Sequence, residues 1–375
     1  MENKFAKWAR LATLAAILIF VTYESYLHQV LGGGKAPSAH ALCPFGALES
    51  LYATIFSGAF IEKIFAGTLI IFIITVVIAL LFRRSFCGLL CPFGALQEFF
   101  GKIGKLIFKK RPTLQPYIDK PLRYLKYIVL ALTVYMAWYT GGLWMAPYDP
   151  YVAYGHITNV VSAISEDPAA IVGFVLLGVS LLGSIVYDRF FCKYLCPMGA
   201  FYAIVGKVSP TKVVRNVDLC IDCKACTKIC PVNIDVAKEV KVTTSECINC
   251  NECVVACPVK GALEVKTAKW TIKPLHMLVI VIVLFFGSIF VADQLGYYKV
   301  IKEMPKAGFT ISILEIKGYF TIEETAKSTG WSLAKTYKLL GIPETVPKTT
   351  KMKAISALVP GYDFDAAKEK ADKIK

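Results

Sequence analysis

Long apolar stretches alternate with short polar segments along most of the chain. A helix needs roughly 20 mostly apolar residues to cross the hydrocarbon core of a bilayer. Five stretches meet that length: Leu11 to about Val30, Phe65–Phe82, Tyr127–Met145, Ala169–Tyr187 and Leu275–Ala292. Glu24 interrupts the outer third of the first stretch. We therefore expect a mainly α-helical, polytopic membrane bundle of about five transmembrane helices.

The charges of the connecting segments predict the orientation of this bundle. Residues 83–126 carry ten Lys or Arg and two acids, whereas residues 146–168 carry three acids and no Lys or Arg. Short cationic loops stay in the cytoplasm. We expect a protein of the cell membrane, with its N-terminus and the segment before the fifth helix in the cytoplasm. The tail, residues 293–375, is expected outside.

The cysteines supply the first chemical signal. Eight of the thirteen lie in two runs with the spacing C-x2-C-x2-C-x3-C-P, followed by Pro231 and Pro258. In two-cluster ferredoxins, three cysteines of one run and the fourth of the other hold each cubane cluster. This spacing predicts one [4Fe-4S] cluster on Cys220, Cys223, Cys226 and Cys257, and another on Cys247, Cys250, Cys253 and Cys230. Zinc and disulfides fit less well, because structural zinc sites use two pairs of ligands and the cytoplasm is reducing.

This pattern also divides the chain. We expect a membrane domain with four helices over residues 1–210, and an inserted β/α two-cluster ferredoxin domain over residues 211–270. The fifth helix would follow at 271–292 and a small helical module at 293–375. More than half of the residues, 56%, are hydrophobic, and the formal net charge is +15. That charge is read as a topology signal with attraction to anionic lipid, and no nucleic-acid partner is expected.

A second cysteine motif occurs twice. Arg84-Ser-Phe-Cys87-Gly-Leu-Leu-Cys91-Pro-Phe-Gly matches Arg189-Phe-Phe-Cys192-Lys-Tyr-Leu-Cys196-Pro-Met-Gly. On a helix, residues four apart share one face, so Cys87, Cys91, Cys192 and Cys196 could offer four thiolates to a third cluster. A redox-active dithiol and a packing role at a helix end are the two alternatives. Cys43 belongs to a degenerate third copy, which we place on the outer side with a structural or partner-binding role.

These motifs together resemble the membrane polyferredoxin family of 4Fe-4S binding proteins over roughly residues 10–292. That family includes the quinol-dehydrogenase subunit of periplasmic nitrate reductase systems and the membrane protein that supplies electrons to nitrous oxide reductase. The resemblance implies electron transfer at the membrane, linked to quinol and to an exported redox protein or flavoprotein. No covalent flavin is expected, because Ser57-Gly-Ala-Phe60 lacks the acceptor threonine.

Clusters at one face of a bilayer need a carrier to reach the other face. No haem is expected, because His28, His40, His156 and His276 all lie at the expected edges of the membrane. A quinone crosses the bilayer unaided and is the simpler carrier. Ionisable groups inside membrane segments are functional candidates, so Glu24 is a candidate proton site for quinone, although it could simply reach the outer interface.

The tail and the function complete the expectations. Thr321-Ile-Glu-Glu324 predicts a capping box, with Gly330 ending that helix and Ser332 starting another. Two such helices resemble a helix-turn-helix motif, but an extracytoplasmic tail would not meet DNA.

The function expected is a relay of electrons between a cytoplasmic carrier, the quinone pool and an exported partner. One alternative is a metal-reducing maturation factor, although Met304 and Met352 are too few for a copper site. Another is a redox sensor or a structural subunit of a larger complex.

Overall fold

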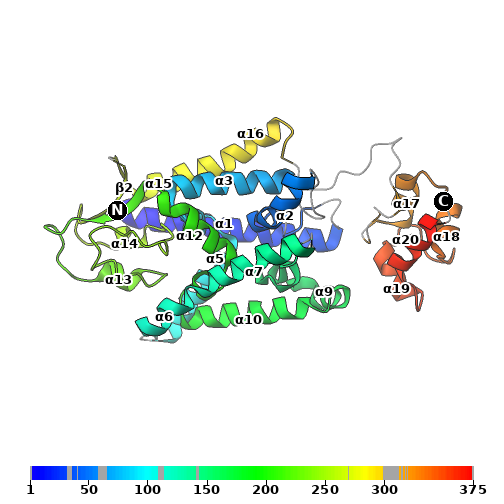
Figure 1. Cartoon of the computed structure of the whole chain (residues 1–375), viewed down its shortest axis with the longest axis horizontal. Helices are drawn as coiled ribbons and strands as arrows, with labels where there is room; N and C mark the ends of the chain where they lie inside the picture. The colour runs from blue at the N-terminus through cyan, green and yellow to red at the C-terminus, as the bar shows by residue number, and fades with distance from the viewer. Residues whose placement is uncertain are drawn as a thin grey trace. The chain divides into compact units, whose positions relative to one another are not determined.

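Helices make up most of the chain and one small sheet interrupts them (Figure 1), which confirms the mainly helical class. The computed structural model describes residues 2–31, 36–39, 41–57, 66–108, 114–140, 143–268, 270–298, 312–313, 316, 318 and 320–373. The chain divides into two units, one of Met1–Gln29 with Pro37–Val300 and one of Val30–Ala36 with Ile301–Lys375.

The first unit is a helical bundle with a ferredoxin-like insert at one end. Its longer helices are α1 (Glu2–Leu31), α2 (Pro44–Ser57), α3 (Ala66–Phe82), α5 (Pro92–Ile107), α7 (Leu125–Thr140), α10 (Ala170–Val186) and α12 (Pro197–Val205). Shorter ones are α4 (Ser85–Leu89), α6 (Pro116–Leu122), α8 (Pro150–Gly155), α9 (Val160–Glu166) and α11 (Phe190–Tyr194). Helix α10 packs on α5 and α8, and α7 packs on α2 and α12.

Two of the expected membrane helices are long and apolar enough to span a bilayer. They are Lys4–Leu31, within α1, and Pro274–Gln294, formed by α15 (Pro274–Ile282), the π-helical turn η4 (Val283–Gly287) and α16 (Ser288–Gln294). The apolar helices α3 and α10 have 17 residues each, and α7 has 16. Within the described part of the chain, length and composition thus support two spans, and the count of five stays an expectation.

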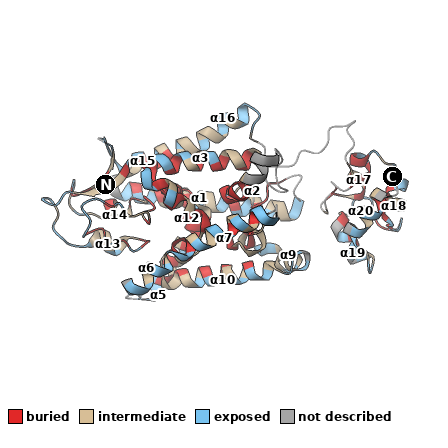
Figure 2. Ribbon diagram, viewed as in Figure 1, coloured by how far each residue is buried: buried red, intermediate tan, exposed pale blue. Residues whose placement is uncertain are grey.

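In the bundle, small and polar side chains are buried and many large apolar side chains are exposed. On α10, Ser180 and Ser184 are fully buried, whereas Leu182 is 66% exposed. On α3, Thr75 is fully buried and Ile73 is 52% exposed. Figure 2 shows the same contrast between the inner and outer faces of these helices. Such surfaces are unfavourable in water, and small or polar residues at helix contacts are typical of membrane bundles.

The insert follows α12 and contains a three-stranded antiparallel sheet in the order β1 (Thr211–Arg215), β2 (Leu263–Thr267), β3 (Trp270–Ile272). Two short helices, α13 (Ala225–Ile229) and α14 (Glu252–Val255), lie between β1 and β2 along the chain. Figure 1 shows α13, α14 and β2 at the end of the unit where α1 begins. The β/α character expected of the insert is confirmed.

The second unit contains α17 (Ile322–Thr329), α18 (Leu333–Leu340), α19 (Ile355–Leu358) and α20 (Phe364–Lys373). The predicted capping box is confirmed, because Thr321 Oγ1 accepts a hydrogen bond from Glu324 N at 3.1 Å and Glu324 Oε2 accepts one from Thr321 N at 2.9 Å. Gly330 ends α17 with a φ of 71°, and Ser332 caps α18. Met352 is fully buried in this unit.

Candidate metal centres

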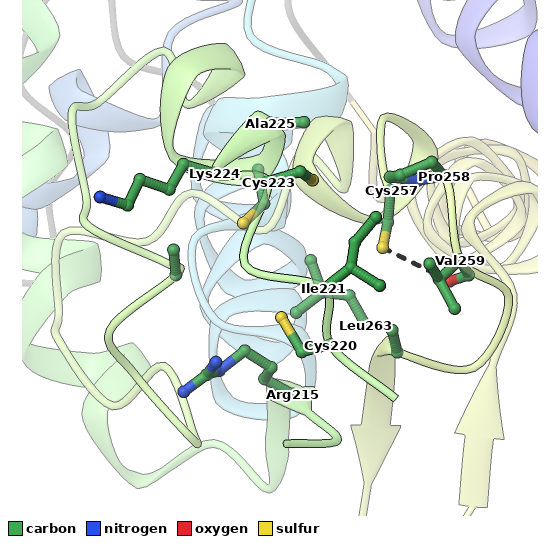
Figure 3. Close-up of a pocket in the computed structure, with 13 residues that line it drawn as sticks. Arg215, Cys220, Ile221, Cys223, Lys224, Ala225, Cys257, Pro258, Val259 and Leu263 are labelled. Atoms are coloured by element: carbon green, nitrogen blue, oxygen red, sulfur yellow. Dashed lines mark hydrogen bonds between the residues drawn. The ribbon is translucent and has the colours of Figure 1, made fainter. Parts of the chain in front are cut away.

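The first hollow of the insert gathers four cysteines from both runs. Its lining includes Cys220, Cys223, Cys226 and Cys257, together with apolar residues and Arg215. Figure 3 shows the sulfurs of Cys220, Cys223 and Cys257 directed toward a common space. The hollow opens to solvent: Cys223 is exposed, and the neighbouring Ile221 is 65% exposed. The surroundings are therefore accessible to another protein.

The second hollow gathers the other four ferredoxin cysteines. Cys247, Cys250 and Cys253 line it with Cys230, which comes from the first run. Its walls are apolar and buried, with Val213 and Ile248 each 1% exposed. Burial raises the pKa of the Cys250 thiol to about 12 and that of the Cys230 thiol to about 11. Iron binds thiolates, so loading this hollow displaces protons from these groups.

Both loops between the cysteines adopt the same unusual backbone. Asp222 and Lys224 flank Cys223 with φ of 49° and 58°, and Asn249 and Asn251 flank Cys250 with φ of 49° and 62°. Asn and Asp tolerate this left-handed region better than most residues. Alternating right- and left-handed residues curve the backbone into anion-binding concavities, which several iron–sulfur sites use. The shared conformation fits two similar anionic groups.

The cysteine groups suit a cluster better than a single ion. In the described residues, no three His, Cys, Asp or Glu side chains lie close enough to hold one metal ion. A pair of clusters would each draw ligands from both runs of cysteines, and the lining of each hollow provides them. Four thiols around one hollow, with curved backbone beneath them, therefore fit such a cluster.

Cations of the helical bundle hold the second half of the insert in place. Arg83 Nη1 donates to Val242 O at 2.7 Å, and its Nη2 donates to Thr243 O at 3.1 Å and to Thr244 O. Lys126 Nζ pairs with Glu246 at 2.6 Å. Further contacts join Arg123 to Val232 O and Asn249 to Phe82 O, at 2.9 and 3.0 Å. The second hollow is thereby fixed against the bundle, whereas the first faces solvent.

The C-x3-C motifs differ from the single helical face that we expected. Cys87 lies on α4 and Cys192 on α11, but Cys91 and Cys196 are the N-caps of α5 and α12, with ψ of 118° and 110°. The prolines that follow exclude helical backbone at these two cysteines. Each N-cap sulfur accepts a hydrogen bond, from Gly94 N at 3.3 Å and Gly199 N at 3.2 Å. These backbone donors favour the thiolate, an effect that burial opposes at both cysteines.

The arginine of each repeat packs against the glycine of the other repeat. Arg84 of the first repeat lies over Gly199 of the second, where a Cβ would stand 2.8 Å from Nη2. Arg189 of the second repeat lies over Gly94 of the first, where a Cβ would stand 2.8 Å from Nη1. Arg189 Nη1 also donates to Cys87 O at 2.6 Å. Each motif thus needs the arginine of the other repeat and a glycine that admits it.

The four sulfurs of the two motifs share one environment. Gln97 Nε2 lies 3.1 Å from Cys192 Sγ, although Gln97 belongs to α5 of the other repeat. Burial raises the pKa of Cys196 well above its usual range, and the thiols of Cys192, Cys87 and Cys91 raise it further. Gln97 of the first repeat contacts Cys192, and Arg189 of the second contacts the backbone of Cys87, so these contacts bring the two motifs together. The four cysteines of the two C-x3-C motifs, which we call the four-cysteine site, therefore lie together.

Cations outnumber carboxylates around these centres. Six cationic side chains are exposed by 3% or less: Arg10, Arg83, Arg84, Lys126, Arg189 and Lys193. In the described part of the chain, their ion pairs are with three carboxylates, those of Glu98, Glu246 and Glu252. Among the described residues, Lys193 Nζ has no hydrogen-bond partner, and neither do Arg84 Nε and Arg189 Nε. Buried charges need compensation, so this region fits anionic groups among the cysteines.

Two other residues singled out by the sequence lie elsewhere. Glu24 is half-buried on α1, between Tyr23 and Tyr26, which are 58% and 50% exposed. Cys43 packs among apolar side chains of the bundle, which fits the structural role. The chain just before it contacts the first turn of α3, where Thr68 Oγ1 donates to Ala41 O at 3.0 Å, and the side of the membrane on which Cys43 lies stays an expectation. His40 lies outside the described residues.

Sequence reasoning missed the residues that surround the cysteines. Arg84 and Arg189 precede the first cysteine of each motif by three positions, and Gly94 and Gly199 follow the second by three. That shared spacing was a visible signal. No local spacing pointed to Glu98 or Gln97, because their partners are about 90 residues away in the chain.

Comparisons with known families agree with these centres. A family model described as "4Fe-4S binding domain" matches residues 64–111 and 169–216, which contain the two C-x3-C motifs. A second, described as "4Fe-4S dicluster domain", matches residues 212–264. No solved structure matches the chain.

Several curated proteins are similar to this chain. The putative electron transport protein YccM of Escherichia coli is 32% identical over 54% of this chain and 56% of its own length. The uncharacterized protein MJ0750 of Methanocaldococcus jannaschii is 31% identical over 54% of this chain and 78% of its own length. The ferredoxin-type protein NapH of Haemophilus influenzae is 24% identical over 61% of this chain and 75% of its own length. By these matches and its iron–sulfur domains, the chain belongs to the membrane-associated polyferredoxin family of electron-transfer proteins.

Proposed function

We propose that the protein relays single electrons between a soluble cytoplasmic carrier and the membrane quinone pool, with an exported redox protein or flavoprotein as the further partner. The observation that carries this proposal is the order of the cysteine groups. The first hollow is exposed, the second is buried against the bundle, and the four-cysteine site lies next to the second. Such an order suits stepwise transfer from solvent into the membrane domain.

In this relay each ferredoxin hollow holds one [4Fe-4S] cluster. Cys220, Cys223, Cys226 and Cys257 would ligate the first, and Cys247, Cys250, Cys253 and Cys230 the second. The grouping of these cysteines around two hollows supports that assignment. Apolar side chains around the first hollow, including Leu219 at 45% exposure, suit docking of a soluble carrier.

The four-cysteine site would hold a third cluster. Four thiols, those of Cys192 buried and of the other three partly buried, would supply the ligands, and two of them lie at helix N-termini. Arg84 and Arg189 supply fixed positive charge beside them, with Nε atoms that lack partners. A redox dithiol would be neutral when reduced and would leave this charge uncompensated. The buried cations therefore favour a cluster over both of the alternatives.

Quinone would connect the clusters to the rest of the membrane. The hydrocarbon core is about 30 Å thick, which is more than clusters at one end of the bundle can bridge. Quinol oxidation or quinone reduction moves protons with electrons, and Glu24 is the acid within the apolar span of α1 that could exchange them. Its half-buried position beside two exposed tyrosines suits contact with a lipid-soluble molecule.

We further propose five membrane helices, with the N-terminus and the ferredoxin insert in the cytoplasm and the tail outside. The exposed apolar faces of α3, α7 and α10 support their insertion in lipid despite their length. The full burial of Met352 removes it from the surface of the tail, which weighs against the alternative of a metal-reducing maturation factor. Met304 lies outside the described residues.

Iron analysis tests this proposal directly. Protein purified without oxygen should contain about twelve iron atoms per chain if three four-iron clusters are present. The double variant Cys87→Ser/Cys192→Ser should fall to about eight, with the two ferredoxin signals kept in its paramagnetic resonance spectrum. Equal iron in both proteins would rule out a third cluster. The variant Cys223→Ser/Cys247→Ser removes one ligand from each ferredoxin cluster. Loss of all iron from this variant would mean that the ferredoxin clusters are the sole iron centres.

A further inference from the structure

The four-cysteine site and the second hollow touch through one residue. Gly88 on α4 follows Cys87 and faces the loop that carries Cys250. A Cβ built on Gly88 would stand 2.4 Å from Ile248 O and 3.1 Å from both Cα and Cβ of Cys250. Ordinary contact begins near 3.4 Å, so a methyl group there would push the Ile248 carbonyl away by about 1 Å. Glycine alone permits this approach.

The repeat itself does not require this glycine. The equivalent position in the second motif, one residue after Cys192, is Lys193. Lys193 is 1% exposed and lies over the ring of Tyr194, 5.2 Å from its centroid. A large side chain is therefore compatible with the motif, and the absence of one at position 88 reflects what lies opposite.

Arginines hold the contact on both sides. Arg10 Nε donates to Gly88 O at 3.0 Å, and Arg10 Nη1 pairs with Glu252 of the insert at 2.8 Å. Arg189 Nη1 donates to Cys87 O at 2.6 Å. Both arginines meet at Glu98, at 2.6 and 3.0 Å. The peptide groups on either side of Gly88 and the insert are thus fixed in one buried network.

We propose that Gly88 is the positioning residue for electron transfer between the second hollow and the four-cysteine site. This inference rests on the proposed function, because it requires a cluster in each place. With a cluster in each place, one electron would pass from the reduced cluster on the Cys250 side to the oxidised cluster on the Cys87 side, with no bond or proton exchanged. A soluble low-potential one-electron donor would supply the electron at the first hollow. Tunnelling rates fall exponentially with distance, so the close approach at Gly88 sets the rate of this step.

The test compares Gly88→Ala with Gly178→Ala in the full chain, purified without oxygen into lipid nanodiscs. Gly178 lies on α10 with nothing within 4 Å of an added Cβ, so it is a matched control. Rapid mixing with a low-potential donor follows reduction of each cluster optically. Paramagnetic resonance of the reduced protein measures the magnetic coupling between clusters, which weakens steeply with distance.

We expect Gly88→Ala to keep its iron content and reduce its ferredoxin clusters normally. Reduction of the third cluster should be several-fold slower, with weaker coupling, while Gly178→Ala matches wild type. Wild-type rate and coupling in Gly88→Ala would overturn the inference. Should Gly88→Ala lose its clusters, Arg10→Lys, which keeps the charge but not the bond to Gly88 O, must show the slowed step instead. The iron content of the wild-type protein tests the proposed function separately from these rates. About eight iron atoms per chain, instead of about twelve for three clusters, would remove the third cluster and with it this inference.

Discussion

Replacing Glu98 by Gln should destabilise the protein more than any surface change. Glu98 Oε2 meets Arg10 Nη2 at 2.6 Å and Arg189 Nη2 at 3.0 Å, and the side chains of these arginines are 4% and 0% exposed. The amide of Gln has no charge to offer, so both cations lose their shared counterion inside the bundle. Removing one partner of a buried ion pair costs about 3–5 kcal/mol.

That free energy corresponds to a measurable shift in melting temperature. Proteins gain roughly 2.1 cal/mol/K of unfolding entropy per residue, or about 0.8 kcal/mol/K for a chain of this length. A loss of about 3–5 kcal/mol then lowers Tm by about 4–6 °C. Intrinsic tryptophan fluorescence of detergent-solubilised protein, heated without oxygen, measures this shift.

The matched control is Glu264→Gln. Glu264 pairs with Lys266 at 3.6 Å on β2 of the same unit, with side chains 34% and 45% exposed. Exposed pairs contribute about 0–1 kcal/mol, so this variant should melt within about 1 °C of wild type. If the Tm of Glu98→Gln equals that of Glu264→Gln, the stabilising role of the buried ion-pair network is refuted.

Acid should remove the difference between wild type and Glu98→Gln. Burial alone would raise the pKa of Glu98, but Arg10 and Arg189 outweigh it and hold the pKa well below its usual range. A carboxylate with a depressed pKa stabilises the fold above its unfolded pKa, near 4.3, and loses that contribution as the pH falls toward the folded value. The Tm difference should therefore be constant from about pH 8 to 6 and shrink only below about pH 4.3.

Three further outcomes follow from the same contacts. Cys223→Ser should remove about four iron atoms and slow reduction by a soluble donor, as iron analysis and rapid mixing would show; unchanged iron would contradict the role of the first hollow. Arg84→Gln should lower the reduction potential of the four-cysteine centre, with Arg84→Lys between it and wild type in a redox titration; equal potentials would exclude electrostatic control by Arg84. Thr321→Ala should weaken amide hydrogen-exchange protection in α17 by about 0.5–2 kcal/mol and leave all cluster spectra unchanged, with Ser332→Ala doing the same in α18.

Local patterns in the sequence predicted the local features of the structure. The apolar stretches predicted helices, the capping residues Thr321 and Ser332 predicted the starts of α17 and α18, and the cysteine spacing predicted the insert with its sheet. Each of these depends on residues close together in the chain. The break of the C-x3-C helix at Cys91 and Cys196 also has a local cause, because the proline after each cysteine disfavours helical backbone at that cysteine.

The surroundings of the cysteines could not be predicted in the same way. Arg10 pairs with Glu252 across 242 positions, and Gly88 of α4 meets Cys250 in the middle of the insert. Such partners depend on how the insert docks on the bundle, which no spacing encodes.

The most direct measurement of the relay is electron transfer to quinone. The clusters of wild-type protein in nanodiscs are reduced without oxygen by a low-potential donor, and a menaquinone analogue is then added while optical and paramagnetic resonance spectra are recorded. The relay predicts prompt reoxidation of the clusters, slowed in Glu24→Gln and unaffected in Glu264→Gln. Clusters that stay reduced until a partner protein is added would contradict a quinone-linked relay.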